Sequence, residues 1–419
     1  MNRTLVNVLL VVLLLSTAYR VVDIAWTPGP LDRMGALRGC DFQVFYLGAW
    51  MIDHGETDQL YREGRLQELQ STLGPINNER NPPYFLYYPP IAPLLLVPLA
   101  RLAYTQATNI WWLLQGICFC ISGWLLARSM QIASGWRTTA WLALLAFYPV
   151  WDTVLHGQLS AELLLILVAG FELQRRRHPV AAAWVLSLLA MKPQWFAGVY
   201  LWLLLRRDWR SLAAMTAGLA CQLAAVAAIL GTSVLVAYVE FLPTCGRIAL
   251  RYAFSPWAEH GIAGIVQNVL VPFGCPKEWG HRVGTLVQLL VAAWAGLMLY
   301  RGAAAGRLAR IANATRNGGN RDSDFSPTAQ ERTCGVLFTA LLTPHLLMYD
   351  LVLLAAPLVN LWSSPRWRLG VALYLATCVI TIPLYETIGF SLVPIVAATV
   401  LYRLTQVNGD AGVPAAGDG

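Results

Sequence analysis

Repeated apolar runs, several of them closed by arginines, constrain the fold of this chain more than any other feature. Many of the runs approach the ~20 residues that a helix needs to cross a bilayer. Of the 419 residues, 57% are hydrophobic and 13% are charged, whereas roughly a quarter of residues are charged in an average protein. We therefore predict an all-α polytopic membrane protein and exclude a soluble globular domain.

Arginine clusters orient the predicted spans. The cluster Arg175–Arg177 ends one apolar run, and Arg206–Arg207 ends another. Alternating spans place nearly all such clusters in the cytoplasm, as the positive-inside rule requires. We attribute the net charge of +7 to this topology and to contact with membrane lipids, rather than to nucleic acid. The pattern predicts a multi-pass protein of the plasma (inner) membrane with both termini cytoplasmic.

The apolar windows predict about twelve spans within one transmembrane domain, residues 1–405. The first span, which follows Arg3, is interpreted as a retained signal anchor. The tail, residues 406–419, is rich in Gly, Ala, Asp and Pro, and is predicted to be disordered and cytoplasmic. The predicted spans cover residues 6–26, 109–127, 139–150, 159–173, 180–190, 195–205, 212–234, 283–300, 336–342, 351–361, 371–383 and 388–402.

Two external loops, residues 27–108 and 235–282, and one cytoplasmic loop, residues 301–332, separate these spans. The first external loop is far longer than a usual connection, which marks it as functional. Within it we predict a helix at residues 64–73. The apolar piece at residues 91–102 is short for a span and is predicted to be an interfacial helix.

Polar residues gather at the predicted external ends of the spans. An ionisable group at membrane depth is costly to keep, so a set of them on one face indicates chemistry or recognition there. The candidate site residues are Asp41, Tyr88, His156, Gln158, Lys192, Gln194, His345 and Asp350.

Asp41 lies just beyond the first span and is flanked by Phe42, Phe45 and Tyr46. Such surroundings lower the local dielectric and raise a carboxyl pKa, which suits a general base that deprotonates a hydroxyl. Asp is also a preferred residue at a helix N-cap. Position alone leaves both interpretations open.

The other candidates have structural alternatives as well. Lys192 ends an apolar run, where its ammonium could bind a phosphate as a point charge or extend to the headgroups. His156 and Gln158 could donate to sugar hydroxyls or phosphate, or be ordinary loop residues. His345 could pair with a phosphate or a carboxylate. Tyr88, with the two prolines after it, fixes a chain reversal before the interfacial helix.

Metal binding finds little support, because the external histidines lack H-x-x-x-H spacing and no carboxylate cluster accompanies them. Asp322 and Asp324 form a D-x-D motif. Their cytoplasmic stretch is too short for the α/β domain that such a nucleotide-sugar site needs, so we interpret it as a solvated loop. Cys245 and Cys275 share the external side and could form a disulfide, which spacing alone does not establish.

In their order along the chain, these motifs resemble the GT-C superfamily of integral-membrane glycosyltransferases. The resemblance is closest to family 87, the polyprenol-phosphate-mannose-dependent α-mannosyltransferases of bacteria, and covers roughly residues 35–365. It rests on Asp41-Phe42 opening a large loop, Tyr88-Pro89-Pro90 before an interfacial helix, Gly157-Gln158 opening a span, Lys192-Pro193-Gln194 closing one, and Pro344-His345 near Tyr349-Asp350.

The resemblance implies a GT-C fold and an enzyme that transfers a hexose from a polyprenyl-phosphate sugar to a lipid or glycan acceptor. Mannose is the hexose that the resemblance favours. The transfer would take place at the extracytoplasmic, or periplasmic, face. The resemblance also implies that Asp41 is the catalytic base, that Lys192 and His345 lie near the donor phosphate, and that Gln158 lies near the sugar. The expected substrate-binding set is completed by Tyr88, His156, Gln194 and Asp350.

The chemistry agrees with that implication. A sugar on a lipid phosphate already has a good leaving group, so we expect no cofactor and no metal. A single carboxylate base suits an inverting displacement, whereas retention would call for a second carboxylate at ~5 Å, a role left open for Asp152 and Asp350. The rival function is transport of lipid-linked sugars, which charges within spans, broken helices and internal repeats would favour. Polar residues at one face and no visible duplication favour the enzyme.

Overall fold

Every named element in the described part of the chain is a helix, which confirms the all-α prediction. One isolated bridge joins Leu31 and Leu37 in the first loop. The computed structural model describes residues 3–62, 64–74, 83–129, 137–251, 260–316, 327–364, 366–378 and 391–410. Asp322, Asp324 and the end of the predicted tail, residues 411–419, lie outside the described residues.

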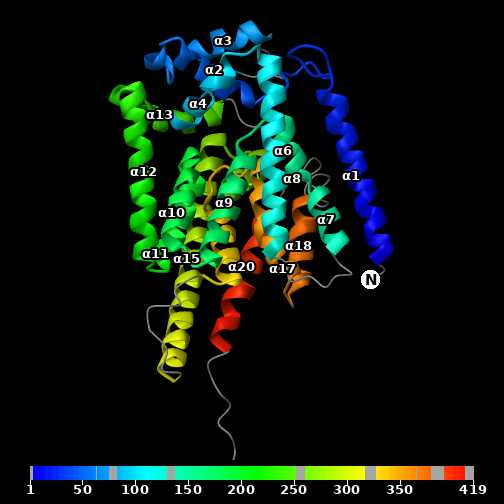
Figure 1. Ribbon diagram of the computed structural model, residues 1–419, viewed down its shortest axis with the longest axis vertical. Coiled ribbons are helices and arrows are strands. Elements are labelled where there is room, and N and C mark those ends of the chain that lie inside the picture. The colour runs from blue at the N-terminus through cyan, green and yellow to red at the C-terminus, as the bar shows by residue number, and fades with distance from the viewer. Residues whose placement is uncertain are drawn as a thin grey trace, which may run out of the picture.

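Four of the described helices are long and apolar enough to cross a membrane. They are α1 (Arg3–Ala25), α6 (Tyr104–Ser129), α12 (Trp209–Leu230) and α15 (Lys277–Arg316). In Figure 1, α1, α6 and α12 run along the long axis of the molecule. Helix α1 buries only Thr17 and exposes side chains such as Leu9 and Leu15. A contiguous apolar face of this kind is accommodated by lipid and not by water. The protein is therefore an integral membrane protein.

The remaining predicted spans are shorter or interrupted helices, so the count of about twelve stays a prediction. Proline contributes to the interruptions, since Pro149 and Pro193 each occupy the first turn of a new helix. These elements are α7 (Arg137–Leu145), α8 (Tyr148–His156), α9 (Ser160–Arg175), α10 (Pro179–Ser187), the 3₁₀ turn η3 (Leu188–Met191), α11 (Pro193–Leu205), α16 (Ala329–Leu342), the 3₁₀ helix η6 (Met348–Leu354), α17 (Ala355–Trp362), α18 (Trp367–Cys378) and α20 (Val393–Asp410).

Small residues let the inner helices approach closely. On α11, a Cβ at Gly198 would lie 2.3 Å from the side chain of Thr339 on α16. On α16, a Cβ at Gly335 would lie 2.6 Å from the ring of Trp202 on α11. Small residues at such positions are the usual way in which membrane helices bring their backbones together. The α11–α16 contact thus forms part of the interior of the bundle.

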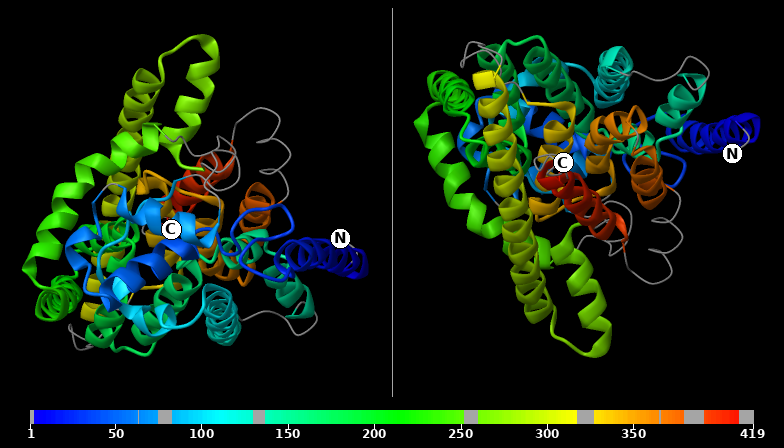
Figure 2. Two further views of the ribbon diagram at one scale, coloured as in Figure 1. Left: turned by 90° about the horizontal axis from the view of Figure 1, so that it is seen from above. Right: turned by 90° about the horizontal axis from the view of Figure 1, so that it is seen from below.

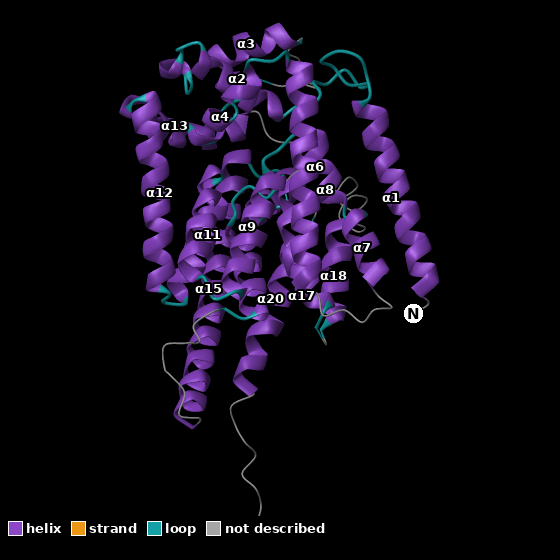
Figure 3. Cartoon of the chain, in the orientation of Figure 1, coloured by secondary structure: helices purple, strands orange, loops and turns teal. Residues whose placement is uncertain are grey.

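The first external loop folds into short helices that cover one end of the bundle, at the top of Figures 1 and 3. The elements are α2 (Phe42–Asp53), the 3₁₀ turn η1 (Thr57–Gln59), α3 (Arg65–Leu73), α4 (Ile91–Leu95) and α5 (Val97–Ala100). Helix α3 confirms the helix predicted at residues 64–73. The predicted interfacial helix at residues 91–102 is instead two short helices separated at Leu96, and both pack against α2.

Several segments predicted to be loops or tail are helical. The second external loop contains most of α13 (Thr232–Arg251), α14 (Ile262–Leu270) and the 3₁₀ turn η5 (Val271–Phe273). Helix α13 begins within the span predicted at residues 212–234, because α12 already ends at Leu230. Helix α15 continues to Arg316, well into the predicted cytoplasmic loop, and extends beyond the bundle opposite the first loop (Figure 1). In both views of Figure 2, α1 lies at the edge of the molecule. Helix α20 continues to Asp410, past the predicted start of the disordered tail at residue 406. Cys245 and Cys275 are free thiols, so the structure holds no disulfide between them.

Candidate functional site

Asp41 occupies the N-cap position of α2, but its carboxylate makes no capping hydrogen bond. Instead, Oδ2 of Asp41 accepts a hydrogen bond of 2.7 Å from Nε2 of Gln158. The amide oxygen of Gln158 in turn accepts a 2.7 Å bond from the hydroxyl of Tyr88. Three residues far apart in the sequence thus form one polar chain, and the carboxylate of Asp41 is directed to this chain rather than to its own helix.

Tyr88 is held by its neighbours on both sides. Its ring meets the ring of Phe45 edge-on, with 4.6 Å between the centroids. Its carbonyl oxygen accepts a 2.9 Å bond from the hydroxyl of Tyr61. Burial raises the pKa of the Tyr88 hydroxyl well above its usual range, so this group stays protonated and remains a donor to Gln158. The polar chain therefore has a defined direction.

A glycine turn brings Gln158 to Asp41. Gly157 ends α8 in the left-handed conformation, with φ +69°, and a Cβ there would lie 2.7 Å from Cβ of Phe42. The indole of Trp111 donates to the Gly157 carbonyl at 2.8 Å, and Gln115 donates to the Gln158 carbonyl at 2.5 Å. The turn is thus fixed against both α2 and α6. Sequence reasoning missed Trp111 and Gln115, because they lie within an apolar run without any motif.

Lys192 forms an ion pair with Asp350, which lies on η6. Both side chains are buried, with 4% and 0% of their surface exposed. Ser160 donates to the same carboxylate oxygen at 3.2 Å. The Lys192 ammonium lies 4.9 Å from the ring centroid of Tyr349 and 5.9 Å from that of Tyr88. Lys192 therefore does not extend to the headgroups, and its charge is balanced inside the protein, as a buried cation requires.

His156 and Asp152 form a second pair, one helical turn apart on α8. The imidazole Nδ1 lies 2.9 Å from the carbonyl oxygen of Asp152 and 3.5 Å from its carboxylate oxygen. The carbonyl of His156 accepts a 2.9 Å bond from the backbone N–H of Asp41. The imidazole also lies beside the ring of Tyr349, with 5.8 Å between the centroids. The structure thus adds Asp152, which the sequence offered only as an alternative carboxylate, to a cluster of polar side chains. The other members of this cluster are Asp41, Tyr88, His156, Gln158, Lys192 and Asp350.

The environment of Asp41 favours its neutral form. Burial raises the pKa of the Asp41 carboxyl, and the charge of His156, the Gln158 hydrogen bond and the charge of Lys192 oppose that shift only in part. A raised pKa is what the aromatic residues around Asp41 predict. A carboxyl with such a pKa is a better proton acceptor than an ordinary surface aspartate.

Two further predicted site residues, His345 and Gln194, lie on segments next to the cluster. The contacts that join Asp41, Tyr88, Gln158, Lys192 and Asp350 include neither His345 nor Gln194. His345 is half-buried on the connection between α16 and η6, where the next residue, Leu346, accepts a 2.6 Å bond from the backbone N–H of His260. Gln194 is half-buried in the first turn of α11.

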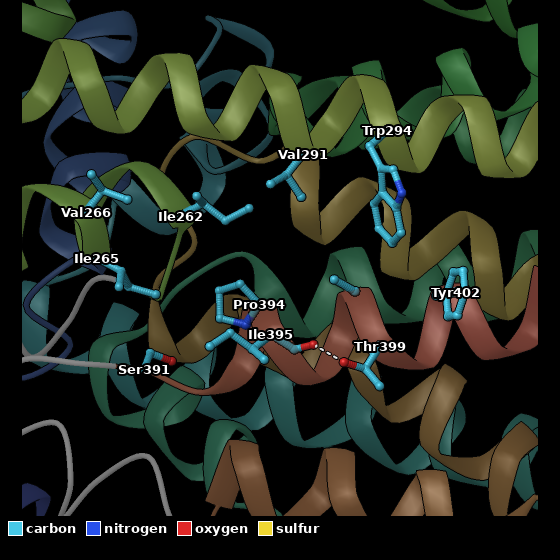
Figure 4. A pocket seen from close by; sticks show the side chains of 11 residues that line it. Ile262, Ile265, Val266, Val291, Trp294, Ser391, Pro394, Ile395, Thr399 and Tyr402 are labelled. Carbon is cyan, nitrogen blue, oxygen red and sulfur yellow. Dashed lines mark hydrogen bonds between the residues drawn. The ribbon is translucent and has the colours of Figure 1, made fainter.

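A groove of about 610 Å³ lies between α14, α15 and α20 and shares no lining residue with the cluster (Figure 4). Its wall is apolar, with side chains such as Val291 and Pro394. Ser391, whose hydroxyl bonds to Nδ1 of His260 at 2.9 Å, lies at one end, and Tyr402 lies at the other. The lining includes no carboxylate, histidine or basic side chain. The groove thus suits contact with hydrocarbon chains, whereas the groups able to move protons belong to the cluster beside Asp41.

The cluster combines a proton acceptor with two cations. In the described residues, no group of three or more His, Cys, Asp or Glu side chains is placed to hold a metal ion. The charges that an anionic substrate would meet come from Lys192 and, when protonated, His156. The arrangement can bind an anion next to a carboxylate base.

The comparison with protein families identifies the chain. The family model for glycosyltransferase family 87 matches residues 85–316, more than half of the chain. The match includes Tyr88, Gln158 and Lys192, whereas Asp41 and Asp350 lie outside it. No curated protein and no solved structure matches the chain. With its membrane-spanning helices, the chain belongs to glycosyltransferase family 87 and is an integral-membrane glycosyltransferase.

Proposed function

We propose that this enzyme transfers a hexose from a polyprenyl-phosphate sugar to a hydroxyl of a lipid or glycan acceptor. Mannose is the favoured hexose. The reaction takes place at the extracytoplasmic face of the plasma membrane, and Asp41 is its general base. The carboxylate of Asp41 carries this proposal, because it stands at a helix N-cap and yet is bound by Gln158 instead of capping the helix. A carboxylate withheld from a structural role is available for chemistry.

The chemical step is an inverting single displacement. The acceptor oxygen forms a bond to the anomeric carbon and releases its proton to Asp41. The bond from that carbon to the phosphate oxygen breaks, and its electron pair leaves with the polyprenyl phosphate. A retaining mechanism needs a second, accessible carboxylate as nucleophile. Asp350 has no exposed surface and is paired with Lys192, while Asp152 adjoins His156, so inversion is favoured.

The residues around Asp41 have separate proposed roles. Gln158 and Tyr88 orient the carboxylate, and Lys192 supplies positive charge that a donor phosphate would share with Asp350. His345 and Gln194 remain proposed substrate contacts at the same face. Because both side chains lie beside the cluster, they would contact the substrate only if it extends to them or if they move when it binds.

Transport of lipid-linked sugars is less well supported. A transporter places its substrate site near the bilayer midplane between repeated helix bundles. Here the carboxylate of Asp41 and the amide of Gln158 meet at the N-terminus of α2, in the first external loop, and the family assignment is enzymatic. The position of the cluster at one end of the bundle therefore supports transfer.

Asp41→Asn tests the proposal directly. Asparagine keeps the size of the side chain but cannot take a proton, so transfer should fall by about 10²–10⁴-fold. The assay uses purified protein, polyprenyl-phosphate mannose and lipids extracted from a deletion strain, with mass spectrometry of the glycolipid products. Asp53→Asn is the matched control, because Asp53 lies on the same helix and forms a surface ion pair with Arg101. Near-normal transfer by Asp41→Asn would show that Asp41 is not the base.

A further inference from the structure

The cluster offers little accessible positive charge to the anionic substrate that the proposed function requires. Three carboxyl groups belong to the cluster, from Asp41, Asp152 and Asp350. The side chain of Lys192 is 4% exposed, and its ammonium is already paired with Asp350. A phosphodiester that enters beside Asp41 therefore needs another cation.

His156 is placed to supply it. Its ring is anchored through Nδ1, which faces the Asp152 carbonyl at 2.9 Å and the Asp152 carboxylate at 3.5 Å. A bond to a carbonyl oxygen requires a proton on Nδ1, which leaves Nε2 as the second position. No hydrogen bond among the described residues uses Nε2, and 26% of the side chain is exposed. The anchored ring thus keeps one nitrogen available to a ligand.

We propose that the imidazolium of His156, held by Asp152, binds the donor phosphate through Nε2–H. This inference rests on the proposed function and assigns the phosphate contact within it. As the sugar–phosphate bond breaks, the phosphate changes from a diester with one negative charge to a monoester with a second one. A charged donor stabilises that developing charge. His156 keeps its proton throughout, because the acceptor proton goes to Asp41.

The local electrostatics agree with this division of roles. Burial lowers the pKa of His156, but the carboxylates of Asp152 and Asp41 outweigh it, so the net shift is upward and favours the imidazolium. A protonated imidazole has no lone pair with which to accept a proton, whereas the carboxylate of Asp41 does. His156 therefore suits a lasting positive charge beside the phosphate, and Asp41 suits the acceptance of a proton.

The matched control is His54. It lies at the C-terminal end of α2, and its Nδ1 faces the carbonyl four residues earlier, that of Trp50, at 2.9 Å. It therefore repeats the local geometry of His156 with Trp50 in the place of Asp152. Because Asp41 precedes and His54 follows the 12 residues of α2, the two lie about 20 Å apart along the helix. His54→Gln therefore removes a similarly anchored imidazole that lies far from the cluster.

The test compares binding of farnesyl phosphate and farnesol to the purified full-length protein. We expect His156→Gln to raise the Kd for farnesyl phosphate about tenfold, because one charge-assisted hydrogen bond is lost. The Kd for farnesol should not change. His54→Gln should bind both ligands like the wild type. Asp152→Asn, as a change in a positioning residue, should raise the donor KM more than it lowers kcat. Imidazole added to His156→Ala should restore part of the farnesyl phosphate affinity.

Each other outcome is informative. If His156→Gln bound farnesyl phosphate with the affinity of the wild type, the inference would be overturned and the proposed function would stay intact. Equal weakening of both ligands, with a lower Tm and no imidazole rescue, would overturn it as well and assign His156 to the stability of α8. If the wild type itself did not distinguish farnesyl phosphate from farnesol, the proposed polyprenyl-phosphate donor would be wrong.

Discussion

Asp41 has two kinds of partner within reach, the backbone N–H groups of α2 and the amide of Gln158. Capping by Asp contributes about 1 kcal/mol to a helix, yet the carboxylate takes the amide instead. The first turn of α2 consequently lacks a side-chain cap at its N-cap residue. A local stabilising interaction is forgone at this one position, which supports the proposed role of Asp41 as base.

The pH dependence of transfer should report the environment of Asp41. Only the ionised carboxyl can take the acceptor proton, so the rate falls as pH drops through its pKa. Burial raises that pKa, so the acid limb of kcat/KM should lie above about 3.9, the value for an unperturbed Asp. The measurement is a pH–rate profile with saturating acceptor lipid. An acid limb at the ordinary value would place the base elsewhere, and Asp53→Asn should leave the profile unchanged.

The buried pair of Lys192 and Asp350 predicts a stability effect that its motif does not suggest. Lys192→Ala leaves the Asp350 carboxyl buried without its partner, which should cost about 3–5 kcal/mol. Adding Asp350→Asn should recover part of that loss. Thermal unfolding in detergent measures both variants. Arg101→Ala breaks the exposed pair with Asp53 and should cost about 0–1 kcal/mol. A similarly small loss for Lys192→Ala would mean that the ion pair is not maintained.

At the scale of elements, the site depends on where helices stop. Helix α8 ends at Gly157, and the 3₁₀ turn η3 ends immediately before Lys192. The 3₁₀ helix η6 carries Asp350 and is continued by α17. Helix ends leave backbone groups without intrahelical partners, and the polar side chains of the site gather around these ends. Short and interrupted helices are therefore part of the construction of the site.

Gly157→Ala should disrupt this construction. The added methyl group meets a left-handed backbone, with φ +69°, and lies 2.7 Å from Cβ of Phe42, the residue after Asp41. We expect a lower Tm and a loss of transfer, because α2 must move away from Gln158. Gly274→Ala is the control, since Gly274 has φ +89° with nothing within 4 Å. Gly274→Ala should cost only about 1–2 kcal/mol of backbone strain and keep full activity. If the two changes lowered Tm and transfer equally, the contact between Gly157 and Phe42 would have no specific role.

At the scale of the whole molecule, the proposed sidedness can be measured. The helices of the first loop cover one end of the bundle, and α15 extends from the other (Figure 1). In a variant without the eight native cysteines, Asp58→Cys should react with a membrane-impermeant maleimide in intact cells. His178→Cys, next to the arginines that end α9, should react only after permeabilisation, as the positive-inside rule requires. The reverse labelling pattern would invert the topology and move the site to the cytoplasm.

Local patterns in the sequence were sufficient for the class of fold and for part of the site. Apolar runs predict helices in a membrane because a span is a local property of about 20 residues. The helix at residues 64–73 is a local property too, and α3 confirms it. The aromatic residues next to Asp41 predicted its raised pKa, but the burial that raises this pKa comes from the tertiary structure. Helix ends were predicted less well, as α15 and α20 show, because polar residues after a span are compatible with a continued helix.

The partners of the site residues were decided only by the tertiary structure. Gln158 binds Asp41 across 117 positions, and Lys192 meets Asp350 across 158. The position of Lys192 in the sequence left a phosphate and the lipid headgroups open as its partner and did not indicate Asp350, beside which the packing of η3 places its ammonium. Which polar groups meet depends on how helices pack and on where turns such as Gly157 direct the chain. Hydropathy and spacing describe each segment separately, so they carry no information about these pairings.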